Sequence, residues 1–115
     1  MEAERSRKIN GRIWLETETG KLIGKGRIEL LERIIATGSI RQAAMQMKMS
    51  YKQAWDLVGE MNEGFSQPLV ISHRGGKGGG HAEVTERGLE IIQEFKELQE
   101  KFFLFLEENK NAFTG

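Results

Sequence analysis

The pattern of hydrophobic and polar positions predicts a short β-hairpin at the start of the chain. Residues 8–16 alternate around Trp14 in the manner of a strand. A turn signal follows at Thr19-Gly20, and the apolar pair at 22–23 predicts a returning strand.

Three helices are expected next. Apolar residues at spacings of three and four predict a helix over residues 27–36, which Gly38 ends. Ser39 and Ser50 are each followed by glutamine at the third position, and this is the capping-box pattern of a helix start. Two such starts eleven residues apart around a short turn indicate a helix-turn-helix. The residues expected to face inward are Ile28, Leu31, Ile34, Ile35, Ile40, Ala43, Ala44, Met47, Ala54, Val58 and Met61.

A glycine-rich hairpin and a long helix complete the pattern. Residues 69–71 and 82–84 predict two short strands on either side of the glycine-rich segment 75–80. Thr85 is expected to cap a final helix that runs to about Glu108. This order predicts a mainly α protein with a small β-hairpin wing (α+β), a winged helix-turn-helix with a long C-terminal dimerisation helix. The whole chain, 1–115, is expected to form one domain, with residues 1–7 and 109–115 flexible.

The final helix carries two apolar rows. The first steps by 4-3-4-3 like a heptad seam and consists of Ile91, Phe95, Leu98, Phe102 and Phe105. The second consists of Leu89, Ile92, Phe103 and Leu106. One helix cannot bury both rows against a domain this small, so we expect one row to pack on the domain and the other on a second subunit. We assign the heptad row to the dimer interface; the alternative is that both rows are buried in one core.

Composition narrows the chemistry. The chain has 115 residues and no cysteine, which excludes disulfides, thiolate metal sites and thiol catalysis. Seventeen basic residues balance seventeen acidic ones, but residues 1–81 hold 13 basic against 9 acidic side chains and residues 82–115 hold 4 against 8. A basic front can therefore meet a polyanion while an acidic back stays away from it. The absence of a long apolar run and of a signal peptide predicts a cytoplasmic protein.

Several strings resemble one family. Ser50-Tyr51-Lys52-Gln53-Ala54-Trp55-Asp56, Glu60-Met61-Asn62 and the glycine-rich segment 75–80 (GGKGGG) resemble the amino-terminal DNA-binding domain of the ModE family of molybdate-responsive transcription regulators. The resemblance spans residues 12–106. It implies a winged-helix protein that binds double-stranded DNA as a homodimer joined through this domain. In members of the family, molybdate binds to β-barrel domains that follow the DNA-binding domain. The resemblance covers the DNA-binding domain only, so we expect no molybdate site and no cofactor in this chain.

The expected DNA contacts lie on the recognition helix, residues 50–62, the wing, residues 72–84, and the helix before them. Lys52 and Gln53 can reach base edges, and Arg74 and Lys77 supply charge beside glycine amides that can approach phosphates. Trp55 can lean on sugar and thymine methyl groups, pack on the wing, or lie half-buried between the recognition helix and the hairpin. The full set is Ser39, Arg41, Ser50, Tyr51, Lys52, Gln53, Trp55, Arg74, Gly76, Lys77 and Gly78.

Other chemistries fit the sequence less well. Gly78 follows Lys77 where a Walker A motif needs serine or threonine. His73 and His81 can meet across the hairpin, but two histidines without further ligands favour polar hairpin positions over a metal site. Asp56 is expected to pair with Lys52 one turn before it. No nucleophile–base pair is apparent, so we predict a DNA-binding transcriptional regulator of an inverted-repeat operator and not an enzyme. The alternatives are a winged-helix protein-interaction module and a non-specific architectural DNA binder.

Overall fold

Helix α1 (Lys25–Thr37) packs against several other elements of the fold. The computed structural model describes residues 7–73 and 80–113. Within them α1 contacts α2, α4, strand β2 and strand β4, and Leu30, Leu31 and Ile34 are fully buried. The sequence prediction placed Ile35 in the core and omitted Leu30; Ile35 is 49% exposed instead. Neighbours cover α1 on several sides, so its buried stripe is broader and turned relative to the simple spacing.

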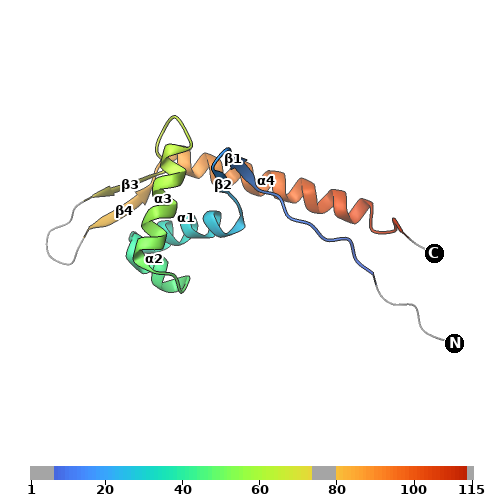
Figure 1. Ribbon diagram of the computed structural model, residues 1–115, viewed down its shortest axis with the longest axis horizontal. Helices are drawn as coiled ribbons and strands as arrows, with labels where there is room; N and C mark the ends of the chain where they lie inside the picture. Colours follow the sequence, from blue (N-terminus) through green and yellow to red (C-terminus); the bar gives the residue numbers. More distant parts are fainter. Residues whose placement is uncertain (1–6, 74–79, 114–115) are drawn as a thin grey trace.

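The helix-turn-helix is formed as predicted (Figure 1). Gly38 adopts a left-handed conformation with φ 69° and ends α1. The Ser39 hydroxyl then accepts from the Gln42 amide at 3.0 Å at the start of α2 (Ile40–Gln46). Ser50 does the same for the Gln53 amide at 3.0 Å at the start of α3 (Tyr51–Glu63). Both capping serines therefore fix where the two helices begin.

The wing is an antiparallel pair, β3 (Val70–His73) and β4 (His81–Val84). Val70 lies opposite Val84 and His73 opposite His81. Residues 74–79 between the strands lie outside the described residues. Near its loop end the hairpin is tied to the end of α1, because the Ala82 amide donates to the Gly38 carbonyl at 2.8 Å.

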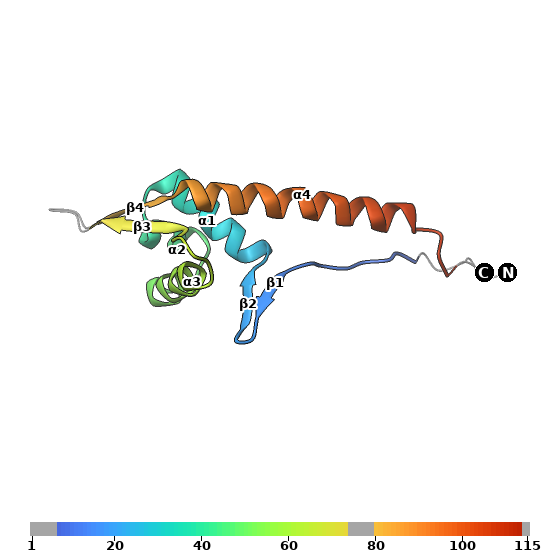
Figure 2. The ribbon, with the colours of Figure 1, turned by 90° about the horizontal axis from the view of Figure 1, so that it is seen from above.

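The amino-terminal strand is shorter than predicted. Only β1 (Leu15–Thr17) pairs with β2 (Gly20–Ile23), so the expectation of a strand over 8–16 is wrong before Leu15. The turn allows β2 only four residues, which leaves the preceding segment without a partner strand. That segment instead runs beside α4 (Figure 2), where Gly11 lies against the Phe102 ring and Arg7 donates to the Phe113 carbonyl at 3.1 Å.

Helix α4 (Glu86–Glu108) begins at Thr85, whose hydroxyl accepts from the Gly88 amide at 3.1 Å. Its first half is part of the core, and its second half extends beyond the helical body, so the molecule measures 70 × 30 × 25 Å (Figure 1). The four helices and two small hairpins form a winged-helix fold. Across the described residues, no helix has the length and apolar character needed to cross a membrane.

Candidate nucleic-acid interface

The outward face of α3 begins with an exposed aromatic pair. Ala54, Val58 and Met61 are buried on the inner side of this helix, as predicted. Tyr51 and Trp55 consequently point outward, 41% and 47% exposed, with ring centroids 6.1 Å apart. An outward aromatic pair at a helix start can stack on sugars or contact thymine methyl groups.

A cation from the preceding helix extends this aromatic pair. The Arg41 guanidinium lies 4.2 Å above the Tyr51 ring, the geometry of a cation–π contact. Arg41 is exposed, so its charge remains open to an anion. Sequence reasoning assigned Arg41 and Tyr51 to DNA separately, and the structure brings them together.

Lys52 and Asp56 form the ion pair expected from their spacing. Lys52 Nζ lies 2.8 Å from Asp56 Oδ2, and both side chains are exposed. The hydrogen bond that Lys52 donates to Asp56, together with the negative charge of that carboxylate, raises the pKa of Lys52 above its ordinary 10.5. Lys52 is therefore a permanent cation on the outer face, although Asp56 offsets part of its field.

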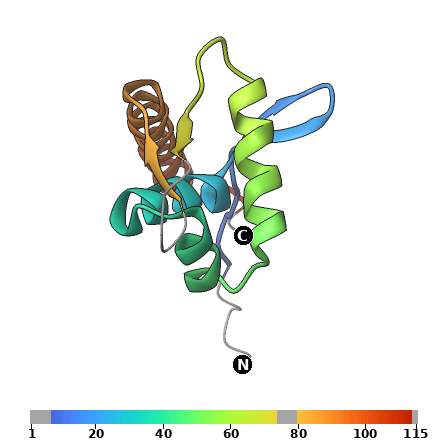
Figure 3. The same cartoon turned by 90° about the vertical axis from the view of Figure 1, so that its left-hand side faces the viewer.

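A hollow of about 500 Å³ lies between the start of α2, the outer face of α3 and the loop ends of β3 and β4. Figure 3 shows how α2, α3 and this hairpin are arranged. Four predicted contact residues line it: Ser39, Arg41, Tyr51 and Trp55. Trp55 thus faces the space between α3 and the hairpin while keeping nearly half of its surface exposed.

The other predicted contacts are placed differently. Lys52 and Gln53 are exposed on α3 outside the hollow, and the Ser50 hydroxyl is occupied as a helix cap. The predicted wing contacts Arg74, Gly76, Lys77 and Gly78 lie outside the described residues.

Two histidines at the loop ends of β3 and β4 also line the hollow. His73 and His81 face each other across the strands with ring centroids 4.6 Å apart and ring planes 24° from parallel. His73 Nε2 lies 3.4 Å from Glu83 Oε1. No group of three or more histidine, aspartate or glutamate side chains with metal-binding geometry occurs among the described residues. The pair is thus a cross-strand stack that adds imidazoles to the same surface as Arg41.

Sequence analysis missed the side chain that joins the recognition helix to the wing. Asn62 Oδ1 accepts from the amides of Leu69 and Val70 at 2.8 and 3.1 Å, and its Nδ2 donates to the Val70 carbonyl at 3.0 Å. An asparagine at a helix end followed within a few residues by a strand is the available signal. The orientation of β3 relative to α3 therefore depends on this amide.

The predicted dimer residues divide into two groups. Ile91 and Phe95 are 6% and 7% exposed and belong to the core of this chain, so assigning them to a subunit interface needs correction. Leu98 and Phe105 are each 57% exposed, and Phe102 is half-buried beside Gly11. The heptad row thus changes role along α4, because the helical body ends before Leu98.

The chain is similar to several curated proteins, although no protein-family model matches it. It is 49% identical over 73 residues to the molybdenum-pterin-binding protein MopA of Rhodobacter capsulatus, which covers 64% of this chain and 28% of MopA. It is 36% identical over 107 residues to the molybdenum transport protein ModE of Azotobacter vinelandii, in a match that covers 90% of this chain and 40% of that protein. It is 44% identical over 80 residues to the DNA-binding transcriptional dual regulator ModE of Escherichia coli K12, in a match that covers 67% of this chain and 30% of that protein.

The chain therefore spans between 28% and 40% of the length of these three relatives. Among solved structures, a mutant form of Lactococcus lactis ZitR superposes with a TM-score of 0.55 at 17% identity, covering 93% of this chain and 73% of that one. That likeness shows a shared fold and nothing further.

Proposed function

We propose that this chain, which belongs to the ModE family of transcriptional regulators in the segment that it shares with them, binds double-stranded DNA and thereby regulates transcription. The observation that carries the proposal is the outer surface formed by α2, α3 and the loop ends of β3 and β4. There Arg41, Tyr51 and Trp55 form one continuous exposed surface around the hollow. Cations and aromatic side chains on the outward face of a capped second helix suit a major groove.

The two sides of this surface have different roles in the proposal. Arg41 contacts phosphate, because its guanidinium is fixed on the Tyr51 ring and points away from the core. Gln53 and Lys52 lie nearer the outer side of α3 and contact base edges. Arg74, Gly76, Lys77 and Gly78, which lie outside the described residues, contact the flanking DNA backbone in this proposal.

We further propose that the chain acts as a homodimer on an inverted repeat. The second half of α4 exposes Leu98, Phe103, Leu104 and Phe105, each more than half accessible. A concentration of exposed apolar side chains on a protruding helix is typical of a protein–protein interface. A twofold pair of recognition helices then requires two half-sites related by the same symmetry. Such a regulator acts in the cytoplasm, at the nucleoid.

We propose DNA binding and not molybdenum binding for this chain, because the matched segment is at most 40% of the relatives' length and the surface formed by α2 and α3 is cationic and aromatic.

A salt titration with matched variants tests the proposal. The wild-type chain should bind duplex DNA with an affinity that falls steeply between about 50 and 200 mM salt, the range in which counterion release is measured. Arg41→Ala should weaken binding to all duplexes and reduce the salt slope by about one. Lys48→Ala removes a cation from the turn before α3 and serves as the charge-matched comparison. Absence of DNA binding at the lowest salt would contradict the proposal and favour a protein partner for the same surface.

A further inference from the structure

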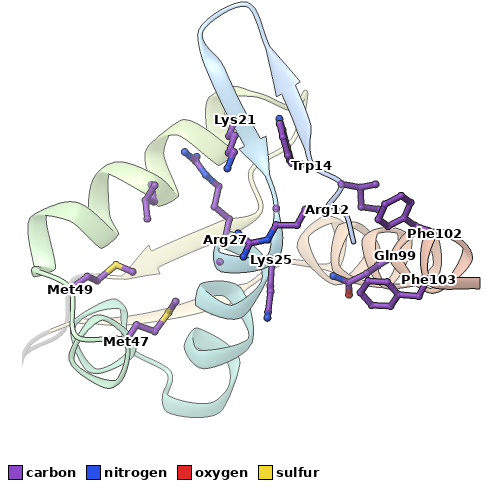
Figure 4. Close-up of a pocket in the computed structure, with 15 residues that line it drawn as sticks. Arg12, Trp14, Lys21, Lys25, Arg27, Met47, Met49, Gln99, Phe102 and Phe103 are labelled. Carbon is purple, nitrogen blue, oxygen red and sulfur yellow. The ribbon is translucent and has the colours of Figure 1, made fainter. Parts of the chain in front are cut away.

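A second hollow lies apart from the proposed DNA surface. It measures about 540 Å³ and is bordered by the segment before β1, the start of α1, the turn between α2 and α3, and the second half of α4 (Figure 4). Among the residues that the structure describes, the two hollows share no lining residue. The volume falls in the range of sites that hold small organic molecules, about 300–1,000 Å³.

The charged residues that line this second hollow are all of one sign. Four cations contribute, Arg12, Lys21, Lys25 and Arg27, and no carboxylate lines the hollow in the described part of the chain. In a chain with equal numbers of acidic and basic residues, four cations around one space favour an anionic occupant.

One of these cations is paired within the chain, and two others are not. Arg27 Nη1 lies 2.9 Å from Glu60 Oε1. Arg12 and Lys25 are exposed and pair with no acidic side chain within residues 7–73 and 80–113. The charge of Arg12, which lies on the segment before β1, is therefore available to a ligand.

The fourth cation lies on an aromatic ring. Lys21 Nζ is 4.7 Å from the centre of the Trp14 ring, a cation–π contact that leaves the positive charge uncompensated. The Trp14 indole nitrogen donates to Glu16 Oε1 at 2.6 Å, which fixes the edge of the ring. Trp14 nevertheless remains 46% exposed and lines the hollow. Lys21 and Trp14 thus offer a charge and a ring face at one place.

The rest of the lining is largely apolar. Phe102 and Phe103 contribute two rings whose centroids are 6.2 Å apart, and Met47 and Met49 contribute two half-buried thioethers. Figure 4 shows the methionines and the phenylalanines on opposite sides of Arg12. Aromatic rings and methionine sulfur both make favourable contacts with another aromatic ring. The lining therefore suits a molecule that combines a negative group with an aromatic body.

Part of this lining belongs to the helix-turn-helix itself. Met47 and Met49 lie in the turn between α2 and α3, and Leu57 lies on α3. The Met49 amide donates to the Ala44 carbonyl at 3.0 Å, which holds the turn against α2. An occupant of the second hollow therefore contacts the same unit that presents the outer face of α3.

We propose that the second hollow binds a small organic anion with an aromatic body, and that this ligand lowers the affinity of the chain for DNA. The anionic group lies at Arg12 and Lys21, and the aromatic body packs on Trp14 and the neighbouring apolar side chains. The bound anion compensates cations in the same small domain as the recognition helix, so the attraction for phosphates weakens. The binding site stands on the hollow alone, whereas the effect on DNA rests on the proposed function.

A fluorescence titration with 8-anilinonaphthalene-1-sulfonate, an aromatic sulfonate, tests the site. Arg12→Gln/Lys21→Gln removes two charges from the lining, and Lys8→Gln/Lys101→Gln removes two exposed charges outside it. The first variant should bind the probe about tenfold more weakly or worse, because it loses two charge-assisted contacts. The second should bind like wild type. All four positions are exposed, so circular dichroism should show native helix content in both variants.

The two tryptophans of the chain report where the probe lies. Trp14 lines the second hollow and Trp55 lines the first. The probe absorbs light that tryptophan emits, so a nearby ring loses emission. At saturation, Trp14 in the Trp55→Phe variant should be quenched more strongly than Trp55 in the Trp14→Phe variant. Equal quenching, or stronger quenching of Trp55, would place the probe elsewhere and overturn the inference.

The effect on DNA is measured with the same probe. Saturating probe should weaken duplex binding by about fivefold or more in the wild-type chain, a typical coupling between two sites, and should have no effect on Arg12→Gln/Lys21→Gln. Probe binding at the second hollow without this change would overturn the regulatory half of the inference and support the site. A chain that binds the probe there but no DNA would contradict the proposed function and again support the site.

The remaining outcomes overturn the site. A wild-type chain that does not bind the probe contradicts it directly. Probe binding that is equal in Arg12→Gln/Lys21→Gln and wild type would show that the probe covers exposed apolar side chains without using the cations. If the wild-type chain binds no probe and Arg12→Gln/Lys21→Gln loses affinity for DNA, the cations meet DNA phosphates and the inference is wrong.

Discussion

Asn62 and Val70 are joined by two hydrogen bonds, one in each direction. The carboxamide oxygen of Asn62 accepts from the Val70 amide at 3.1 Å, and its nitrogen donates to the Val70 carbonyl at 3.0 Å. The side chain thus acts as a strand partner for the start of β3 while belonging to the last turn of α3. The recognition helix and the wing are consequently held as one unit, which a DNA reader needs for both to meet the duplex together.

Replacing Asn62 by alanine should therefore affect both stability and binding. The change leaves the part-buried amides of Leu69 and Val70 without their acceptor, and this costs about 1–3 kcal/mol of unfolding free energy. Urea denaturation measures the loss. Asn62→Asp keeps the acceptor and removes the donor, so it should cost less than alanine. Equal losses for the two variants would contradict the role given to the acceptor.

Gly88 is a second position that constrains the sequence, because the packing around it leaves no room for a side chain. A Cβ atom there would lie 2.5 Å from the Leu69 carbonyl oxygen and 2.5 Å from Val84 Cγ1. Gly88→Ala should therefore push α4 away from the wing base and lower the unfolding free energy by about 1–3 kcal/mol. Gly26→Ala on α1 meets nothing within 4 Å and should be neutral or slightly stabilising by thermal denaturation. A neutral Gly88→Ala would show that α4 and the hairpin are not packed this closely.

The pair between Lys52 and Asp56 predicts a gain of DNA affinity from removing a charge. Asp56→Asn removes the carboxylate that pairs with Lys52, and this leaves the Lys52 ammonium free to contact DNA. Binding should tighten several-fold at about 0.1 M salt, with a steeper salt dependence. Fluorescence anisotropy with a labelled duplex measures both. Unchanged or weaker binding would place this side of α3 away from the duplex.

The same pair should persist across the neutral range. Because the pKa of Lys52 is raised in the folded chain, its contribution to stability is fully present below the ordinary 10.5 and is lost only as pH rises through the folded value. Lys52 should therefore stay charged from pH 6 to 9, and the affinity for DNA should show no pH-dependent change in this range that is lost in the Lys52→Gln variant. A step in that interval that disappears in Lys52→Gln would contradict the raised pKa.

The exposed half of α4 gives a direct test of the homodimer. Phe105 is one of the exposed apolar side chains in the second half of α4, with 57% of its surface accessible. Phe105→Glu places a charge there and should convert the dimer to a monomer in sedimentation velocity. Met45→Glu makes the same kind of change at a 70% exposed residue of α2 and should leave the dimer intact. Dissociation by both variants would indicate a general effect of charge and contradict a specific α4 interface.

The sequence predicted the helix-turn-helix well because local chemistry determines it. The capping roles of Ser39 and Ser50 and the inward positions of Ala54, Val58 and Met61 depend on spacing within one or two turns. These signals remain valid whatever the rest of the chain does.

Tertiary partners decided the rest. The strand expected before Leu15 is absent because β2 is too short to pair with it, and periodicity cannot reveal the length of a partner. Ile91 and Phe95 share a row with Leu98, but only the first two lie where the helical body reaches α4. The role of Asn62 depends on where β3 returns, which a count along the chain does not show. The predictions for Arg74, Gly76, Lys77 and Gly78 remain predictions.

The most direct test of the central claim is a selection of DNA fragments by the purified chain at about 0.15 M salt, followed by sequencing. We expect the wild-type chain to enrich a shared inverted repeat. The Gln53→Ala variant should select a different base within each half-site. A retained pool without any common motif would contradict sequence-specific regulation and indicate an architectural binder. No retention, even at low salt, would contradict DNA binding by α3 and the wing altogether.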